Sequence, residues 1–117
     1  MKIFFKFFIT FIFINIQSVY SEVYKVDNNQ LQNLIVSGVP IIDIRAKDEW
    51  LSTGVIKNSH LLTFFDEYGN YDVEGWEYKL KKIVNKEDPF ILICRSGSRT
   101  SIISNYLSKS RNYSKVY

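Results

Sequence analysis

Short apolar runs and amphipathic stretches alternate along the chain from residue 22 onward. The apolar runs predict strands at residues 23–26, 41–44, 59–63, 90–93 and 115–117. The stretches between them repeat apolar positions at helical spacing, and they predict helices at 28–37, 47–51, 74–84 and 100–108. Because strands that alternate with helices form parallel sheets, we predict an α/β fold with helices on both faces of the sheet.

Polar and special residues mark the ends of the predicted elements. Asp27 and Gln30 have the spacing of a capping box, which places the start of the first helix, and Gly38 ends it. The runs 41–44 and 90–93 are almost continuously apolar, as strands in the middle of a parallel sheet are. These two runs are therefore the predicted centre of the sheet.

The first 21 residues have the order of a secretory signal. Lys2 and Lys6 precede an apolar run at 7–14, and small serines follow, the last being Ser21. We predict cleavage after Ser21, which leaves one periplasmic or secreted domain at residues 22–117. The run is shorter than the about 20 apolar residues that span a membrane. The alternatives are an uncleaved anchor, which would be the only membrane contact, and a buried strand.

The composition excludes several kinds of binding site and redox site. A net charge of +3 gives no argument for nucleic acid binding. The single cysteine, Cys94, excludes an intramolecular disulfide, a zinc finger and a CxxC redox pair, and we expect neither a metal nor a cofactor. Residues 79–117 hold 9 basic and 2 acidic side chains. This excess would draw an anionic substrate toward Cys94, but the asymmetry taken alone favours an ordinary solvated face.

Cys94 stands where the strand 90–93 ends, and a polar loop follows it. Ligands of open α/β sheets bind just beyond the carboxyl ends of strands, and loop N–H groups before a helix cradle anions. Gly97 allows a left-handed turn, and Arg95 and Arg99 add positive charge. We therefore expect the pKa of Cys94 to fall below the free value of about 8.5. The alternative is an inert cysteine at a buried strand end.

The run from Cys94 to Thr100 resembles the active-site loop of single-domain rhodaneses, an exported bacterial type in this case. Asp43-Ile44-Arg45, Glu49-Trp50 and Gly54-Val55-Ile56 resemble the Asp-x-Arg…Glu…Gly-His-Ile signature of the same family. The resemblance covers about residues 23–117 and implies a five-stranded parallel sheet. It also implies transfer of sulfane sulfur through a Cys94 persulfide. The implied binding residues are Arg95, Ser96, Gly97, Ser98 and Arg99, supported by Asp43, Arg45 and Thr100.

Loop length favours sulfur over phosphate. Sulfurtransferases of the family have a six-residue loop from cysteine through arginine, whereas related phosphatases place five residues between the two. Cys94 and Arg99 have four residues between them. Val55 departs from the family histidine, and residues 57–59 depart from Pro-Gly-Ala. His60 follows them, and we expect a structural role for it rather than a Cys–His pair for acyl transfer.

The supporting residues need partners. Asp43 lies in an apolar strand, and a buried carboxylate must be paired, so we expect it to hold Arg99 or loop amides. Arg45 is expected to pair with Glu49 or to border the pocket. The family continues past the last strand with a Gly-rich turn and a helix, so we predict a domain that is truncated at its C-terminus and possesses no such helix.

Two functional hypotheses follow from the sequence. The first is a sulfurtransferase that takes sulfur from a small anionic donor, thiosulfate or a persulfide, and passes it to cyanide or a thiol. The second is a non-catalytic rhodanese-like module that binds a partner protein; the presence of Cys94 favours the first. A phosphatase is a weaker third hypothesis.

Overall fold

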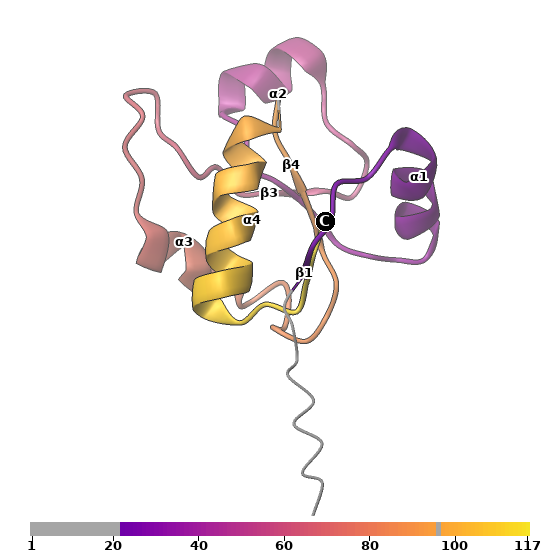
Figure 1. Ribbon diagram of the computed structural model, residues 1–117. Helices are drawn as coiled ribbons and strands as arrows, with labels where there is room; N and C mark the ends of the chain where they lie inside the picture. Colours follow the sequence, from indigo (N-terminus) through magenta and orange to yellow (C-terminus); the bar gives the residue numbers. More distant parts are fainter. Residues whose placement is uncertain (1–21, 96) are drawn as a thin grey trace, which may run out of the picture.

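The computed structural model describes residues 22–95 and 97–117 (Figure 1). Strands and helices alternate along this part of the chain, as the sequence predicts. The order is β1 (Glu22–Val23), α1 (Asn28–Val36), β2 (Ile41–Asp43), α2 (Lys47–Thr53), β3 (His60–Leu61), α3 (Val73–Leu80), β4 (Ile91–Ile93), α4 (Ser98–Arg111) and β5 (Lys115–Val116).

The strands form two short parallel sheets that are joined side by side. Three strands follow the order β3-β2-β4, and β1 pairs with β5. A parallel bridge between Phe90 and Val116 links the two sheets, and the Leu92 N–H donates to the Tyr117 carbonyl at 2.8 Å. Two further backbone bonds join the same segments: the Phe90 N–H donates to the Lys115 carbonyl at 3.2 Å, and the Tyr117 N–H donates to the Phe90 carbonyl at 3.0 Å. The expected parallel pairing is present, but the five strands form a three-stranded and a two-stranded sheet instead of one five-stranded sheet.

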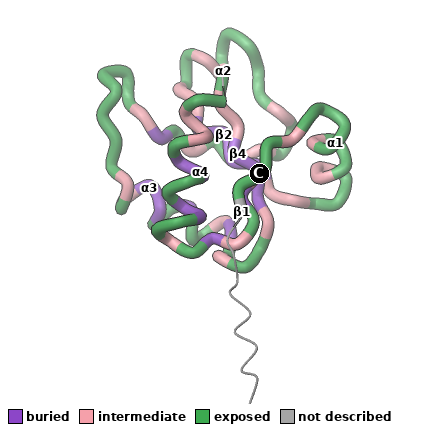
Figure 2. Tube along the Cα trace, viewed as in Figure 1, coloured by how far each residue is buried: buried purple, intermediate pink, exposed green. Residues whose placement is uncertain are grey.

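Helices cover both sides of the strands, which confirms that part of the prediction. In Figure 1, α3 and α4 lie on one side and α1 on the other. Buried residues concentrate on the strands and on the sides of α3 and α4 that face them, whereas α1 has no fully buried residue (Figure 2). The core therefore lies mainly between the strands and the pair α3–α4. Its largest fully buried members include Ile42, Ile44, Leu80, Phe90, Ile103, Leu107 and Tyr113.

Local sequence signals place several helix ends. The Asp27 carboxylate accepts the Gln30 N–H at 2.8 Å, and the Gln30 side chain accepts the Asp27 N–H at 2.9 Å, so the predicted capping box is confirmed. Gly54, at φ 79°, ends α2 where a side chain would be strained. The prediction for α3 is too long, because the chain tightens into turns at 81–83.

Strand register brings the predicted site residues to one edge. Asp43 lies opposite Ile93, so the carboxyl ends of β2 and β4 are level. The residues that follow these strands, including Arg45 and Cys94, therefore emerge at the same edge of the sheet. Within the described ranges, no helix is both long and apolar enough to cross a membrane. The predicted leader, residues 1–21, lies outside the described residues.

Candidate active site

Cys94 directly follows β4 and is half-buried against the hydrophobic core. Its Sγ accepts the Gly97 N–H at 3.0 Å and lies 3.6 Å from the Thr100 hydroxyl. That hydroxyl donates in turn to the Gly97 carbonyl at 3.0 Å. The loop therefore folds back on the sulfur and presents at least one backbone N–H to it, as the sequence predicts for an anion cradle.

Gly97 makes this return possible. It adopts φ 78° and ψ −14°, the left-handed conformation that costs a non-glycine residue about 1–2 kcal/mol. It is also the residue before α4, so the helix begins immediately beside the sulfur, at Ser98. The first turn of α4 contains no acidic residue. The positive end of the helix dipole therefore faces the position of a sulfur anion, and no carboxylate in the first turn weakens this effect.

The far end of the loop is fixed by a salt bridge between α4 and α2. Arg99 donates from Nη1 and Nη2 to the two Glu49 carboxylate oxygens, both at 2.9 Å. The side chains are 28% and 20% exposed. The hydrogen bonds from Arg99 hold the pKa of the Glu49 carboxyl below its usual value, and Glu49 raises the pKa of Arg99. Two parallel bonds fix the plane of the guanidinium as well as its position.

Asp43 and Arg45 form a second pair at the same edge. The Arg45 Nη2 and Nε groups donate to Asp43 at 2.8 and 3.0 Å, and the Arg45 backbone N–H donates at 3.1 Å. Arg45 also donates to the Thr53 hydroxyl and the Gly54 carbonyl, at 2.6 and 2.7 Å. Burial alone would raise the pKa of Asp43, but the hydrogen bonds from Arg45 outweigh it and lower that pKa. The pair therefore ties β2 to the end of α2.

Both expected partnerships are thus corrected. Asp43 does not hold Arg99, and Arg45 does not pair with Glu49. Residues two apart on an extended chain point to the same side, so Arg45 reaches back to Asp43 more easily than it reaches α2. This leaves Glu49 for Arg99. The period-two spacing was a signal for the first pair, whereas no local signal pointed to the second.

The structure describes Arg95, Ser98 and His60, three of the remaining residues that the sequence singled out. Arg95 is exposed, and it forms no ion pair with any residue of 22–95 or 97–117. Ser98 is exposed at the start of α4. Ser96 lies outside the described residues. His60 opens β3, which is separated from β4 by β2, so the two strands are about 10 Å apart. This separation does not favour a Cys–His pair.

A groove opens beside the loop, on the side of α4 that faces the segment after β1. It has a volume of about 860 Å³ and is reached at Gly97, Ser98 and Thr100. Its walls come from both ends of the chain, so no local pattern in the sequence predicts it. Its other walls are Val23, Tyr24, Lys25, Val26, Leu92, Ser101, Ser104, Asn105 and Tyr117.

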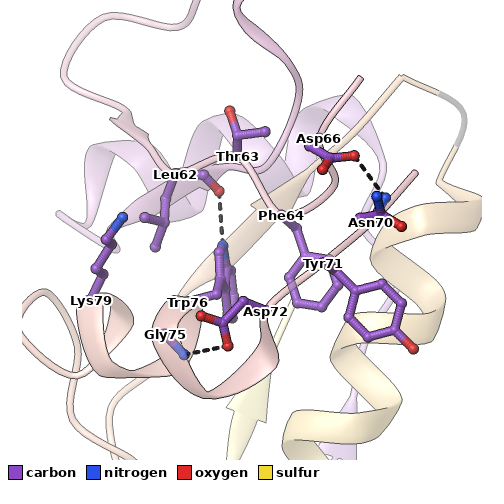
Figure 3. Close-up of a pocket in the computed structure, with 10 residues that line it drawn as sticks. All are labelled: Leu62, Thr63, Phe64, Asp66, Asn70, Tyr71, Asp72, Gly75, Trp76 and Lys79. Atoms are coloured by element: carbon purple, nitrogen blue, oxygen red, sulfur yellow. Dashed lines mark hydrogen bonds between the residues drawn. The ribbon is translucent and has the colours of Figure 1, made fainter. Parts of the chain in front are cut away.

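A separate pocket of about 520 Å³ lies between the end of β3 and α3 (Figure 3). Trp76 donates its indole N–H to the Leu62 carbonyl at 2.9 Å, and Asp72 accepts the Gly75 N–H at 3.1 Å, so polar groups around it are used locally. Neither Cys94 nor any described residue of its loop lines this pocket. We therefore do not include it in the site.

A comparison with known protein families gives a match over nearly the whole described chain. The family description "Rhodanese-like domain" matches residues 27–117, which includes the loop, both ion pairs and all four helices. A search of curated proteins found no significant match.

Proposed function

The chain belongs to the rhodanese-like domain family, and from this premise we propose that it is a sulfurtransferase in which Cys94 carries sulfane sulfur as a persulfide. The observation that supports this most directly is the Gly97 N–H, which donates to the Cys94 Sγ at 3.0 Å from a left-handed turn beside the start of α4. An inert cysteine at a strand end needs no backbone donor directed at its sulfur.

The proposed reaction has two displacement steps. The Cys94 thiolate attacks the outer sulfur of a donor, forming one S–S bond as the donor's own S–S bond breaks. With thiosulfate as donor, sulfite leaves with the bonding electron pair, and Cys94 holds a persulfide anion. A thiophile such as cyanide then attacks the terminal sulfur, forming thiocyanate and restoring the Cys94 thiolate. Neither step needs an external oxidant or reductant.

The residues around the loop support these steps in different ways. The loop amides and the start of α4 stabilise negative charge on the sulfur. The salt bridge between Arg99 and Glu49 fixes the end of the loop that presents the Gly97 N–H to the sulfur. Arg95, which is exposed beside Cys94, is placed to attract an anionic donor.

Mass spectrometry tests the proposal. After incubation of the folded protein with thiosulfate or an organic persulfide, the intact mass should increase by one sulfur atom. Addition of cyanide should remove that sulfur and release thiocyanate. The Cys94→Ser variant is the control and should gain nothing. A folded wild-type protein that gains no sulfur from either donor contradicts the proposal and favours the non-catalytic binding module, and hydrolysis of an aryl phosphate would favour a phosphatase.

We also propose that the domain works outside the cytoplasm, on the basis of the leader sequence at residues 1–21. Expression in a bacterium followed by fractionation and N-terminal sequencing tests this. The expected product begins at Glu22 and is found in the periplasm or the medium. A product that retains Met1 in the cytoplasm contradicts it.

A further inference from the structure

Lysines from two segments meet at the edge of the strands that lies opposite Cys94. The paired strands are all parallel, so their amino ends share one edge and their carboxyl ends share the other. Residues 81–89, before β4, and residues 109–115, at the end of α4 and the start of β5, lie at the amino edge. The Ser114 N–H donates to the Lys86 carbonyl at 2.8 Å, so the two segments are in contact. Figure 1 shows them together at the lower end of the molecule, beside the start of β1.

The two segments carry five lysines, which we call the basic edge: Lys81, Lys82, Lys86, Lys109 and Lys115. All are exposed except the half-buried Lys86, and none forms an ion pair within residues 22–95 and 97–117. Arg111 lies among them, but Glu77 compensates its charge at 2.7 Å. The acidic residues of this edge are fewer, namely Glu22, Glu87 and Asp88. The basic edge therefore keeps an excess of positive charge at the surface.

Exposed tyrosines accompany these lysines. Tyr78, in the last turn of α3, is 64% exposed, and the Lys82 Nζ lies 4.4 Å from the centroid of its ring. Tyr106 is also exposed, and it lies one turn before Lys109 on the same face of α4. Tyrosine combines an apolar ring with a polar tip, and it is enriched where lipid headgroups meet water. Lysines beside such rings are more typical of a lipid-facing surface than of an ordinary solvated face.

The rest of the domain has the opposite charge. Residues 43–74, which include α2 and the loop after β3, hold 7 acidic and 3 basic side chains. The carboxyl ends of β2 and β3, like Cys94 after β4, lie at the carboxyl edge. An anionic surface would therefore attract the basic edge and repel the acidic part, which would turn Cys94 away from that surface.

The leader favours a membrane over other polyanions. Its apolar run at 7–14 precedes β1, which begins opposite Lys115 in the register of β1 and β5. A secretory leader brings the chain that follows it to a membrane, and here that chain enters the domain at the amino edge. The lipid surface is thus the polyanion that the basic edge would meet first.

We infer that the basic edge binds anionic lipid headgroups and holds the domain on a membrane surface, with Cys94 directed toward the aqueous side. This contact differs from the one expected of an uncleaved leader, because it uses the folded domain. It also adds a location to the proposed function without depending on the sulfur chemistry.

Partition onto lipid vesicles tests the inference. The full chain is expressed, and the protein is used in the form that the cell produces. Cosedimentation gives its partition coefficients on vesicles of phosphatidylcholine and on vesicles of phosphatidylcholine and phosphatidylglycerol in equal parts. The ratio of the two coefficients isolates the effect of lipid charge from any contribution of a retained leader. We expect a ratio of at least about fiftyfold, since each lysine near an anionic surface strengthens binding about fivefold. The ratio should fall to near one in about 1 M salt, where the Debye length is about 3 Å.

A charge variant locates the contact. Lys81→Gln/Lys82→Gln should lower the ratio at least about tenfold. Lys25→Gln/Lys47→Gln is the matched control, because it removes the same charge from exposed residues that follow the carboxyl ends of β1 and β2, and it should lower the ratio less than about threefold. Circular dichroism checks that both variants are folded. A water-soluble maleimide should alkylate Cys94 as fast on anionic vesicles as in solution.

Four results would overturn the inference. A wild-type ratio near one excludes the lipid contact, and equal losses in the two double variants exclude the basic edge as its location. Slower alkylation of Cys94 on vesicles contradicts the orientation. Tighter binding to a DNA or RNA oligonucleotide than to anionic vesicles at the same salt concentration would assign the basic edge to nucleic acid. The sulfurtransferase proposal is unaffected by these results, since sulfur loading tests it separately.

Discussion

Replacing Glu49 should loosen the loop and lower stability in a pH-dependent manner. Two charge-assisted hydrogen bonds of 2.9 Å join Glu49 to Arg99, and both side chains are about three-quarters withdrawn from solvent. Exposed ion pairs contribute about 0–1 kcal/mol, whereas breaking a buried pair costs about 3–5 kcal/mol. The intermediate burial places the cost of Glu49→Ala at about 2 kcal/mol, which shifts the urea midpoint by about 1 M.

The sign of the pH dependence follows from the pKa of Glu49, which Arg99 holds below its usual value of 4.5. A carboxyl whose folded pKa is lowered stabilises the fold above its unfolded pKa, and this contribution is lost as the pH falls through the folded pKa. The difference between wild type and Glu49→Ala should therefore be full at pH 7 and shrink as the pH falls below about 4.5.

Urea unfolding at pH 7, 4.5 and 3, followed by tryptophan fluorescence, measures this difference. Glu87→Ala serves as the control, because it removes an exposed carboxylate of the same size near the other edge of the sheet. A Glu49→Ala variant as stable as the wild type at pH 7 would refute the reasoning. So would a loss of stability that stays the same at all three pH values, since this would reflect packing rather than charge.

Three further predictions concern single side chains. The Tyr113 hydroxyl is buried and has no hydrogen-bond partner among the described residues, and burial raises its pKa to about 12. Tyr113→Phe should therefore increase the free energy of unfolding by about 1 kcal/mol. A lower free energy of unfolding in urea titrations would contradict this. Gly97 has φ 78°, so Gly97→Ala should lower the free energy of unfolding by about 1–2 kcal/mol. The same variant should slow the alkylation of Cys94 by iodoacetamide. An unchanged alkylation rate would argue against the role of the Gly97 N–H. Arg99→Ala should reduce sulfur transfer about tenfold and Arg95→Ala less than threefold, because only Arg99 closes the loop; equal, mild effects in a cyanide assay would refute this.

Sequence reasoning succeeded where the signal is local. The capping box of Asp27 and Gln30 and the position of Cys94 just beyond a strand both depend on residues that are close in the chain. The extended i, i+2 spacing of Asp43 and Arg45 is also a local signal, and it favours the pairing that the structure shows.

Apart from the length of α3 and the pairing of Asp43 with Arg45, the errors concern contacts between distant segments. Glu49 and Arg99 are 50 positions apart, and their pairing depends on how α2 docks beside α4, which no residue spacing specifies. The division of the strands into two joined sheets depends on how many backbone bonds form between β4 and β5. The groove is likewise a product of packing, since its walls come from residues 23–26 and from the last third of the chain.

The docking of α2 has a consequence for motion in the native state. No residue of α2 is fully buried, so less apolar burial opposes its detachment than opposes the unfolding of the core strands. Its detachment would release Arg99 while the core between the strands and α4 stays intact. Hydrogen exchange should therefore show the amides of α2 and of the first turn of α4 opening together, at a lower free energy than the amides of β2 and β4. Such an opening would remove the salt bridge that holds the loop around Cys94 without unfolding the core.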